Sequence, residues 1–121
     1  MSVQNSITTA ELAVMQVLWN AGIPLKIQEV WEQLPDAGWK YNTVGTLLLR
    51  LEEKGAVHCE KIGKNRVYTP LLDKEDYTRT QTRGIIDLLY HGSVKELAAA
   101  LMRSEGLTAE DIDDLRKEFD L

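Results

Sequence analysis

The chain has 121 residues, a formal net charge of −5 and 44% hydrophobic residues, which is an ordinary composition for one soluble domain or two small ones. No apolar run approaches the roughly 18 residues that a membrane-spanning helix needs, and the N-terminus lacks the basic, then apolar, pattern of a signal peptide. The single cysteine, Cys59, excludes an intrachain disulfide and favours a reducing compartment. We therefore expect a cytoplasmic protein that does not bind membranes directly.

The negative charge is concentrated in the second part of the chain. Residues 1–72 carry seven basic and seven acidic residues, whereas residues 73–121 carry seven basic and twelve acidic residues. Most of the basic residues of the first part lie between positions 40 and 66. The acidic total therefore does not argue against nucleic-acid binding by the first part.

Two helices are predicted before residue 38. Thr8 and Glu11 have the spacing of a capping box, and the apolar residues that follow predict a helix ending near residues 20–22. Pro24 blocks its continuation. Apolar residues at helical spacing predict a second helix over residues 27–34, and the Pro-Asp-Ala-Gly sequence at 35–38 predicts a turn.

A third helix is predicted within the stretch from Trp39 to Gly55. Its apolar stripe consists of Val44, Leu47, Leu48 and Leu51. The opposite side carries small hydroxyl and amide residues with one arginine, which suit base edges and phosphates. An ordinary amphipathic surface helix has the same pattern, so the flanking elements must decide between the two interpretations.

Residues 56–62 and 66–71 read as strands joined by Gly-Lys-Asn at 63–65, which predicts a β-hairpin. Three helices followed by a hairpin predict a winged helix-turn-helix domain over residues 1–72, although the hairpin could also be a structural cap. The recognition helix, at about residues 42–54, would enter the major groove, and a basic wing at 61–66 would reach adjacent phosphates. Arg50 could instead pair with Glu29 or Glu53. The candidate DNA-binding residues are Lys40, Asn42, Thr43, Thr46, Arg50, Lys64 and Arg66.

Residues 73–121 predict a helical dimerisation domain. Three amphipathic helices are expected there, and Ser93–Glu96 and Thr108–Asp111 have capping-box spacings. So short a segment cannot bury all of its apolar stripes alone, which favours a twofold dimer whose winged domains address a palindromic DNA site. Packing against the chain's own winged domain is the alternative. The expected dimerisation residues are Ile85, Leu89, Leu97, Leu101, Ile112, Leu115 and Phe119. The expected fold class is mainly α with a small β-hairpin.

We expect no metal site, no cofactor and no catalytic centre. His58 and Cys59 are adjacent on a predicted strand, so their side chains point to opposite faces. His91 reads as a helix-end residue, and the acidic residues at 110–114 suit the start of a helix better than a divalent ion. No Gly-rich phosphate loop or Ser/His/Asp set is visible, which argues against an enzyme.

Motifs along nearly the whole chain carry a family resemblance. They are TAELAVMQVLW at 9–19, Trp39, TVGTLLLRLEEKG at 43–55, VYTPL at 67–71, GSVKEL at 92–97 and LTAEDI at 107–112. In their order and spacing they resemble bacterial repressors of the penicillinase and methicillin-resistance operons, together with copper-responsive relatives. The resemblance implies a homodimeric winged-helix repressor that binds near-palindromic operator DNA and blocks transcription of its own and neighbouring genes.

The resemblance also indicates where this chain departs from its relatives. In antibiotic-responsive members the signal of a membrane sensor leads to cleavage at an Asn–Phe pair in the dimerisation domain. The corresponding pair here is Ala100–Leu101, so the same cleavage specificity is not implied, and any sensor or protease system would act indirectly. The C-terminal Cys-x-Cys pairs of copper-responsive members are absent. Relatives often carry a basic residue where this chain has Asn42, which leaves room for a different operator sequence.

Two further functions remain open from the sequence. One is a protein–protein adaptor that kept the winged fold without binding DNA. The other is a sensor that holds a small ligand between the two domains, with induction that does not use cleavage.

Overall fold

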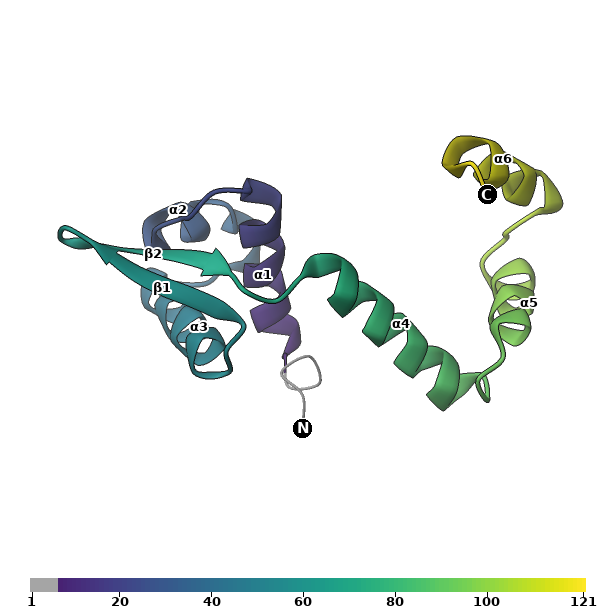
Figure 1. The fold of residues 1–121 in the computed structure, drawn as a ribbon, viewed down its shortest axis with the longest axis horizontal. Coiled ribbons are helices and arrows are strands. Elements are labelled where there is room, and N and C mark those ends of the chain that lie inside the picture. The colour runs from purple at the N-terminus through teal and green to yellow at the C-terminus, as the bar shows by residue number, and fades with distance from the viewer. Residues whose placement is uncertain (1–6) are drawn as a thin grey trace. The chain divides into compact units, whose positions relative to one another are not determined.

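The computed structural model describes residues 7–121, whose elements follow the predicted order of three helices, a β-hairpin and three further helices (Figure 1). The first part contains α1 (Thr9–Ala21), α2 (Ile27–Glu32), the short 3-10 helix η2 (Pro35–Ala37), α3 (Tyr41–Glu53), β1 (Val57–Ile62) and β2 (Asn65–Pro70). The remaining helices are α4 (Lys74–Leu89), α5 (Val94–Ser104) and α6 (Ala109–Phe119). The chain divides into two compact units, residues 1–78 and 79–121. The domain boundary expected after Leu72 stays a prediction.

The first unit is built around one apolar core to which α1, α2, α3 and the hairpin all contribute. Its buried members are Val14, Met15, Leu18, Leu25, Val30, Val44, Leu47, Leu48, Leu51, Ala56, Val57, Tyr68 and Leu72. Trp19 extends this core to the start of α4, because its indole Nε1–H donates a hydrogen bond to the Leu72 carbonyl (2.8 Å) and its ring lies 5.8 Å from that of Tyr77.

The predicted capping box of α1 is confirmed. The Thr8 N–H donates to Glu11 Oε1 (2.8 Å), and the Glu11 N–H donates to Thr8 Oγ1 (3.1 Å). These bonds satisfy two backbone donors that the first turn of a helix leaves without partners. The helix ends at Ala21, because Gly22 adopts φ +67°, a left-handed conformation that glycine tolerates.

The second helix is shorter than predicted: the range 27–34 was wrong at its C-terminal end. The helix stops at Glu32, and Leu34 leaves the helical region with φ −124° and ψ 49°. The cause is Pro35, since a proline disfavours helical geometry in the residue before it. At the other end, the Lys26 N–H donates to Glu29 Oε1 (2.8 Å), so Glu29 supplies a cap that the sequence did not reveal.

The hairpin is confirmed, but its turn is tighter than predicted. Ile62 pairs with Asn65, so the connection is the two residues Gly63 and Lys64 rather than three. Gly63 has φ +62°, as the first residue of a type II′ turn requires. A short bridge also joins Leu25 to Tyr68, through backbone hydrogen bonds of 3.1 and 2.8 Å, and thereby fixes the start of α2 beside β2.

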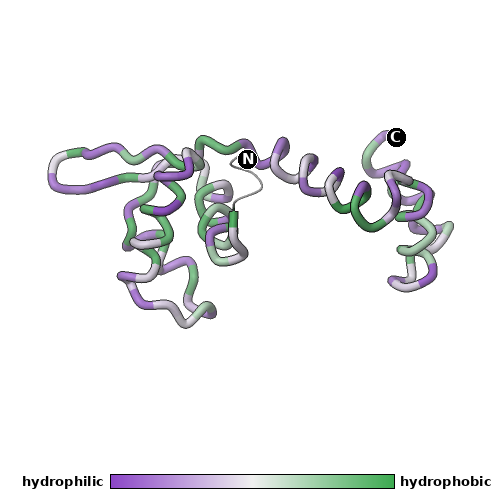
Figure 2. The backbone as a smooth tube through the Cα atoms, turned by 90° about the horizontal axis from the view of Figure 1, so that it is seen from below, coloured by the Kyte–Doolittle hydropathy of each residue, from purple (hydrophilic) through white to green (hydrophobic). Residues whose placement is uncertain are grey.

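The second unit buries little of its own apolar surface. Thr108 and Asp111 form a complete capping box, because Thr108 Oγ1 accepts from the Asp111 N–H (3.1 Å) and Asp111 Oδ2 accepts from the Thr108 N–H (2.9 Å). At Ser93 one of the two bonds of a capping box is present: Ser93 Oγ accepts from the Glu96 N–H (3.1 Å). Ile86 is the buried apolar residue of this unit, and hydrophobic and hydrophilic residues are interspersed along all of its helices (Figure 2). No helix within residues 7–121 is long and apolar enough to cross a membrane.

Candidate nucleic-acid interface

The orientation of α3 is set by its apolar side. Val44, Leu48 and Leu51 are fully buried and Leu47 is 5% exposed, so the stripe predicted from sequence is confirmed. Because these four residues face the core, the opposite side of the helix must face solvent. The packing of α3 thus presents its polar side outward.

Trp31 of α2 holds the turn that leads into α3. Its indole Nε1–H donates to the Trp39 carbonyl (2.8 Å), and the Tyr41 ring lies edge-on to it at 6.0 Å. The sequence showed Trp31 only as an apolar residue of a helical stripe. Its hydrogen bond ties α2 to the residues immediately before α3, which is how the two helices of a helix-turn-helix keep a fixed relation.

The exposed face of α3 contains all the polar residues that were predicted for it. Asn42, Thr43, Thr46 and Arg50 are exposed, and so is Lys40 at the N-cap. The Thr46 hydroxyl donates to the Asn42 carbonyl (3.0 Å), so its oxygen remains available as an acceptor for an outside donor. Leu49, which is 52% exposed, adds an apolar contact to this polar face.

Arg50 has no partner within the described part of the chain. Its guanidinium makes no hydrogen bond or ion pair with any residue from 7 to 121. Glu29, one alternative partner considered from sequence, uses Oε1 to cap α2. A guanidinium presents several donors in a rigid fork, and those of Arg50 are directed to solvent.

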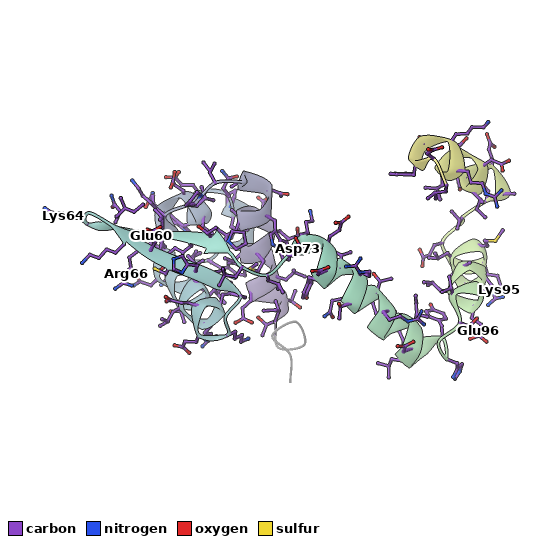
Figure 3. All side chains as sticks on the ribbon, viewed as in Figure 1. Glu60, Lys64, Arg66, Asp73, Lys95 and Glu96 are labelled. Carbon is purple, nitrogen blue, oxygen red and sulfur yellow. The ribbon has the colours of Figure 1, made fainter. Side chains whose placement is uncertain are left out.

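The hairpin carries the basic residues of the predicted wing. Lys64 lies at the exposed tip, and Arg66 follows on β2 (Figure 3). Arg66 Nη1 lies 3.8 Å from Cys59 Sγ, a contact that raises the pKa of Arg66 above its ordinary value and keeps the side chain cationic. Burial and the neighbouring Cys59 raise the pKa of Tyr68 to about 12, so its phenol stays neutral. The wing therefore presents cations and no phenolate at neutral pH.

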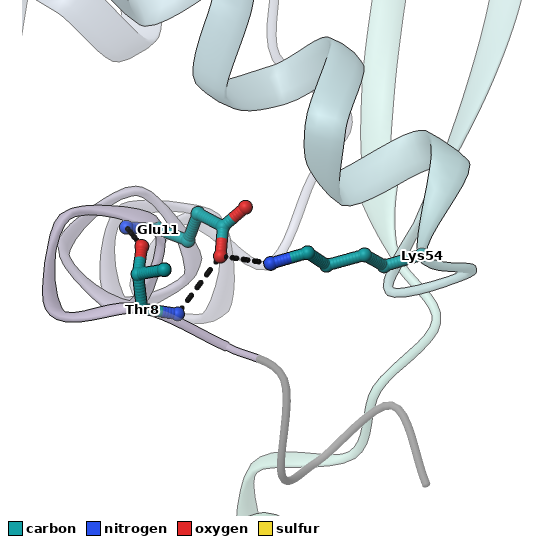
Figure 4. A network of polar contacts seen from close by, with 3 residues as sticks. All are labelled: Thr8, Glu11 and Lys54. Carbon is teal, nitrogen blue, oxygen red and sulfur yellow. Dashed lines mark hydrogen bonds and ion pairs between the residues drawn. The ribbon is translucent and has the colours of Figure 1, made fainter. Parts of the chain in front are cut away.

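An ion pair connects the end of α3 to the start of α1. Lys54 Nζ lies 2.5 Å from Glu11 Oε1, and the Glu11 side chain is 1% exposed (Figure 4). Burial alone would raise the pKa of Glu11, but hydrogen bonds from Lys54 and Thr8 outweigh it and leave that pKa below its ordinary value. No motif in the sequence indicated this ion pair between residues 43 positions apart. In the structure it positions α3 on α1.

Cys59, His58 and the acidic residues of α6 were the other candidates for chemistry in the sequence. Cys59 is a partly buried free thiol, and the neighbouring His58 is exposed. Within residues 7–121 no three His, Cys, Asp or Glu side chains converge as a metal site requires. Hydrogen bonds with the backbone N–H and the hydroxyl of Thr108 lower the pKa of Asp111, as expected of a helix cap.

The described elements have the arrangement of a winged helix-turn-helix domain. The α3 helix buries its apolar side and exposes its polar side, α2 precedes it, and a basic β-hairpin follows it. The comparisons with known proteins agree with that class. The penicillinase repressor family matches residues 7–120. The penicillinase repressor of Bacillus licheniformis is 33% identical over 110 residues, which are 90% of this chain and 85% of that protein. This chain belongs to the penicillinase repressor family.

Two solved structures resemble the first part of the chain. The solution structure of the DNA-binding domain of the repressor BlaI is 40% identical and has a TM-score of 0.54, covering 64% of this chain and 94% of that one. The monomeric form of Bacillus licheniformis BlaI in complex with the blaP half-operator is 41% identical, with a TM-score of 0.50, and covers 60% of this chain and 88% of that one.

Proposed function

We propose that this protein is a homodimeric transcriptional repressor that binds palindromic operator DNA. In this proposal α3 enters the major groove and the wing contacts the neighbouring backbone. The observation that carries the proposal is the exposed polar face of α3, on which Arg50 has no protein partner within residues 7–121. The relative solved with its blaP half-operator supports DNA as the partner.

Each residue of the α3 face has chemistry suited to DNA. Arginine is a bidentate donor to guanine, the Asn42 amide can pair with adenine, and hydroxyls bond to bases or phosphates. Leu49 offers the apolar surface that thymine methyl groups accept. Lys40 precedes the helix, where an ammonium can reach the phosphate backbone. The repressor would therefore combine base contacts from α3 with phosphate contacts from its ends and the wing.

Binding to the gene's own upstream region tests the proposal. Fluorescence anisotropy with that duplex should give a steep dependence on salt, because each neutralised phosphate contributes a slope of about −0.9 in log K against log salt. Arg50→Ala should lose about 1–3 kcal/mol of discrimination at one base pair of each half-site, while its unfolding curve stays unchanged. Arg103→Ala, which changes an exposed arginine in α5, is the matched control. Full affinity in the Arg50→Ala protein would refute the assignment of α3.

We also propose that residues 73–121 form the dimer interface. Ile85, Leu89 and Phe119 are 51%, 62% and 64% exposed in the single chain, and Leu101 and Leu115 are 38% and 40% exposed. Leu97 and Ile112 are half-buried. Exposed apolar residues at helical spacing on a short segment are typical of helices that complete their core with a second copy.

Sedimentation tests the dimer. At micromolar concentration the mass should be about twice the 13.7 kDa of one chain, and Leu115→Asp should shift it toward the monomer. Leu71→Asp, at an exposed leucine of the first unit, is the control and should remain dimeric. A monomeric parent protein would contradict this assignment. Ala100 and Leu101, the pair at the family's cleavage position, lie inside α5, and cleavage there stays a prediction to be tested with the cognate protease.

A further inference from the structure

A groove in the first unit lies between the start of α2, the start of α3 and the tip of the wing. It has a volume of about 290 Å³ and is lined by Lys26, Ile27, Gln28, Tyr41, Lys64, Asn65 and Arg66. The Leu25–Tyr68 backbone bridge places Lys26 beside β2, although the two segments that meet there are far apart in the sequence. Lys26 was not among the residues predicted to bind DNA.

The charge of this groove is one-sided. Three of the lining residues are cations and none is acidic, in a chain whose net charge is −5. The ammonium groups of Lys26 and Lys64 make no hydrogen bond or ion pair with other residues from 7 to 121. Like charges that converge on one groove repel one another, and an anion placed between them removes that repulsion.

The neutral residues of the groove indicate what kind of anion fits. The amides of Gln28 and Asn65 and the phenol of Tyr41 supply uncharged donors beside the cations. Such a mixture of ammonium, guanidinium, amide and hydroxyl donors is the set that proteins use for phosphate and sugar oxygens of nucleic acids. Tyr41 is also the first residue of α3, so the groove begins where the proposed base-reading face begins.

We propose that this groove holds the phosphodiester backbone of one operator strand, and that Lys26 is a phosphate contact of the repressor. The inference rests on the proposed DNA-binding function and extends it to the start of α2. The wing and α2 then contact the same strand from two sides, while α3 reads the adjacent major groove. Contacts of this kind fix the register of the protein on DNA without adding sequence information.

Lys26→Met tests this site, because methionine keeps an unbranched side chain of similar length and removes the charge. Lys26 is exposed, and the cap of α2 joins its backbone N–H, not its side chain, to Glu29 Oε1. The variant should therefore fold normally, as tryptophan emission would show. Loss of one phosphate contact per subunit, two per dimer, should lower affinity about 60-fold at 0.1 M salt and reduce the salt slope by about 1.8. The loss should be equal for the operator and for a random duplex. Tyr41→Phe should weaken both to a smaller extent.

Lys74→Met is the matched control. Lys74 is an exposed lysine next to Asp73, which lies at the opposite end of the first unit from Lys64 (Figure 3), so its loss should leave affinity and slope unchanged. Unchanged affinity and slope in Lys26→Met would overturn the inference while leaving the proposed function intact. No binding by the parent protein would overturn the proposed function itself. Binding of inorganic phosphate that Lys26→Met abolishes, with DNA affinity unchanged, would mark a small-anion site and overturn the assignment to a DNA strand.

Discussion

Replacing Lys54 with methionine would test the ion pair that fastens α3 to α1. The Glu11 carboxylate is 1% exposed, its Oε1 accepts from Lys54 and Thr8, and its Oε2 is buried without a hydrogen-bond partner. Without Lys54 the buried Glu11 carboxylate would keep one backbone donor, the N–H of Thr8. Removing one partner of a buried ion pair costs about 3–5 kcal/mol, and partial exposure of the partner lowers that cost through solvent screening. Because Lys54 is 27% exposed, we expect a loss of about 2–3 kcal/mol.

Chemical denaturation followed by tryptophan emission would measure this loss. All three tryptophans of the chain, Trp19, Trp31 and Trp39, lie in the first unit, so the signal reports on the part that contains the ion pair. The protein concentration must be held fixed, since dimerisation shifts apparent stability. For a domain of this size, 2–3 kcal/mol corresponds to about 10–20 °C in Tm. Lys61→Met, at an exposed lysine of the wing, should stay within about 0.5 kcal/mol of the parent.

The effect should also depend on pH. The pKa of Glu11 in the folded protein lies below the ordinary glutamate value of about 4.3, so its stabilisation is present above that pH and is lost as the pH falls through the folded-state pKa. Without Lys54 the folded-state pKa rises, because burial is then opposed by fewer hydrogen bonds. As the pH falls, Glu11 is therefore protonated at a higher pH in the variant than in the parent protein. The difference in the free energy of unfolding between the two proteins should shrink accordingly.

A double-mutant cycle with Glu11→Gln separates the pair from other effects of the substitutions. A coupling near zero, or a loss under about 0.5 kcal/mol at neutral pH, would refute the conclusion that this ion pair holds α3 in place. The same result would show that Lys54 does not position the exposed polar face of α3.

Three further substitutions test the α3 region. Trp31→Phe removes the hydrogen bond to the Trp39 carbonyl and should cost about 0.5–1.5 kcal/mol and weaken operator binding; unchanged binding would show that the turn is held without it. Gly45→Ala should stabilise the first unit by about 0.5–1 kcal/mol, since an added Cβ meets Ile27 Cδ1 at 3.7 Å, an ordinary contact; destabilisation would reveal crowding between α2 and α3. Thr46→Val should change stability by less than about 0.5 kcal/mol yet weaken operator binding, and equal binding would exclude its hydroxyl as an acceptor from DNA.

The sequence alone determined the features that depend on neighbouring residues. Buried residues recur along a surface helix with the helical period. The apolar stripe of Val44, Leu47, Leu48 and Leu51 and the polar face opposite it could therefore be predicted from the order of the residues. Caps act over three residues, and those of Thr8, Ser93 and Thr108 were predicted correctly. The errors were also local in origin: Pro35 shortened α2, and the turn of the hairpin closed over two residues instead of three.

The contacts between distant segments were decided only by the tertiary structure. Lys54 meets Glu11 across 43 positions, and Leu25 pairs with Tyr68; no periodicity in the chain signals either contact. The basic groove depends on both the bridge and the hairpin, because they bring Lys26 next to residues 64–66. A pattern of burial reports which face of an element is covered, but it does not report what covers it. That choice follows from how the elements pack, and the packing places the polar face of α3 and the basic hairpin on the surface that we propose binds DNA.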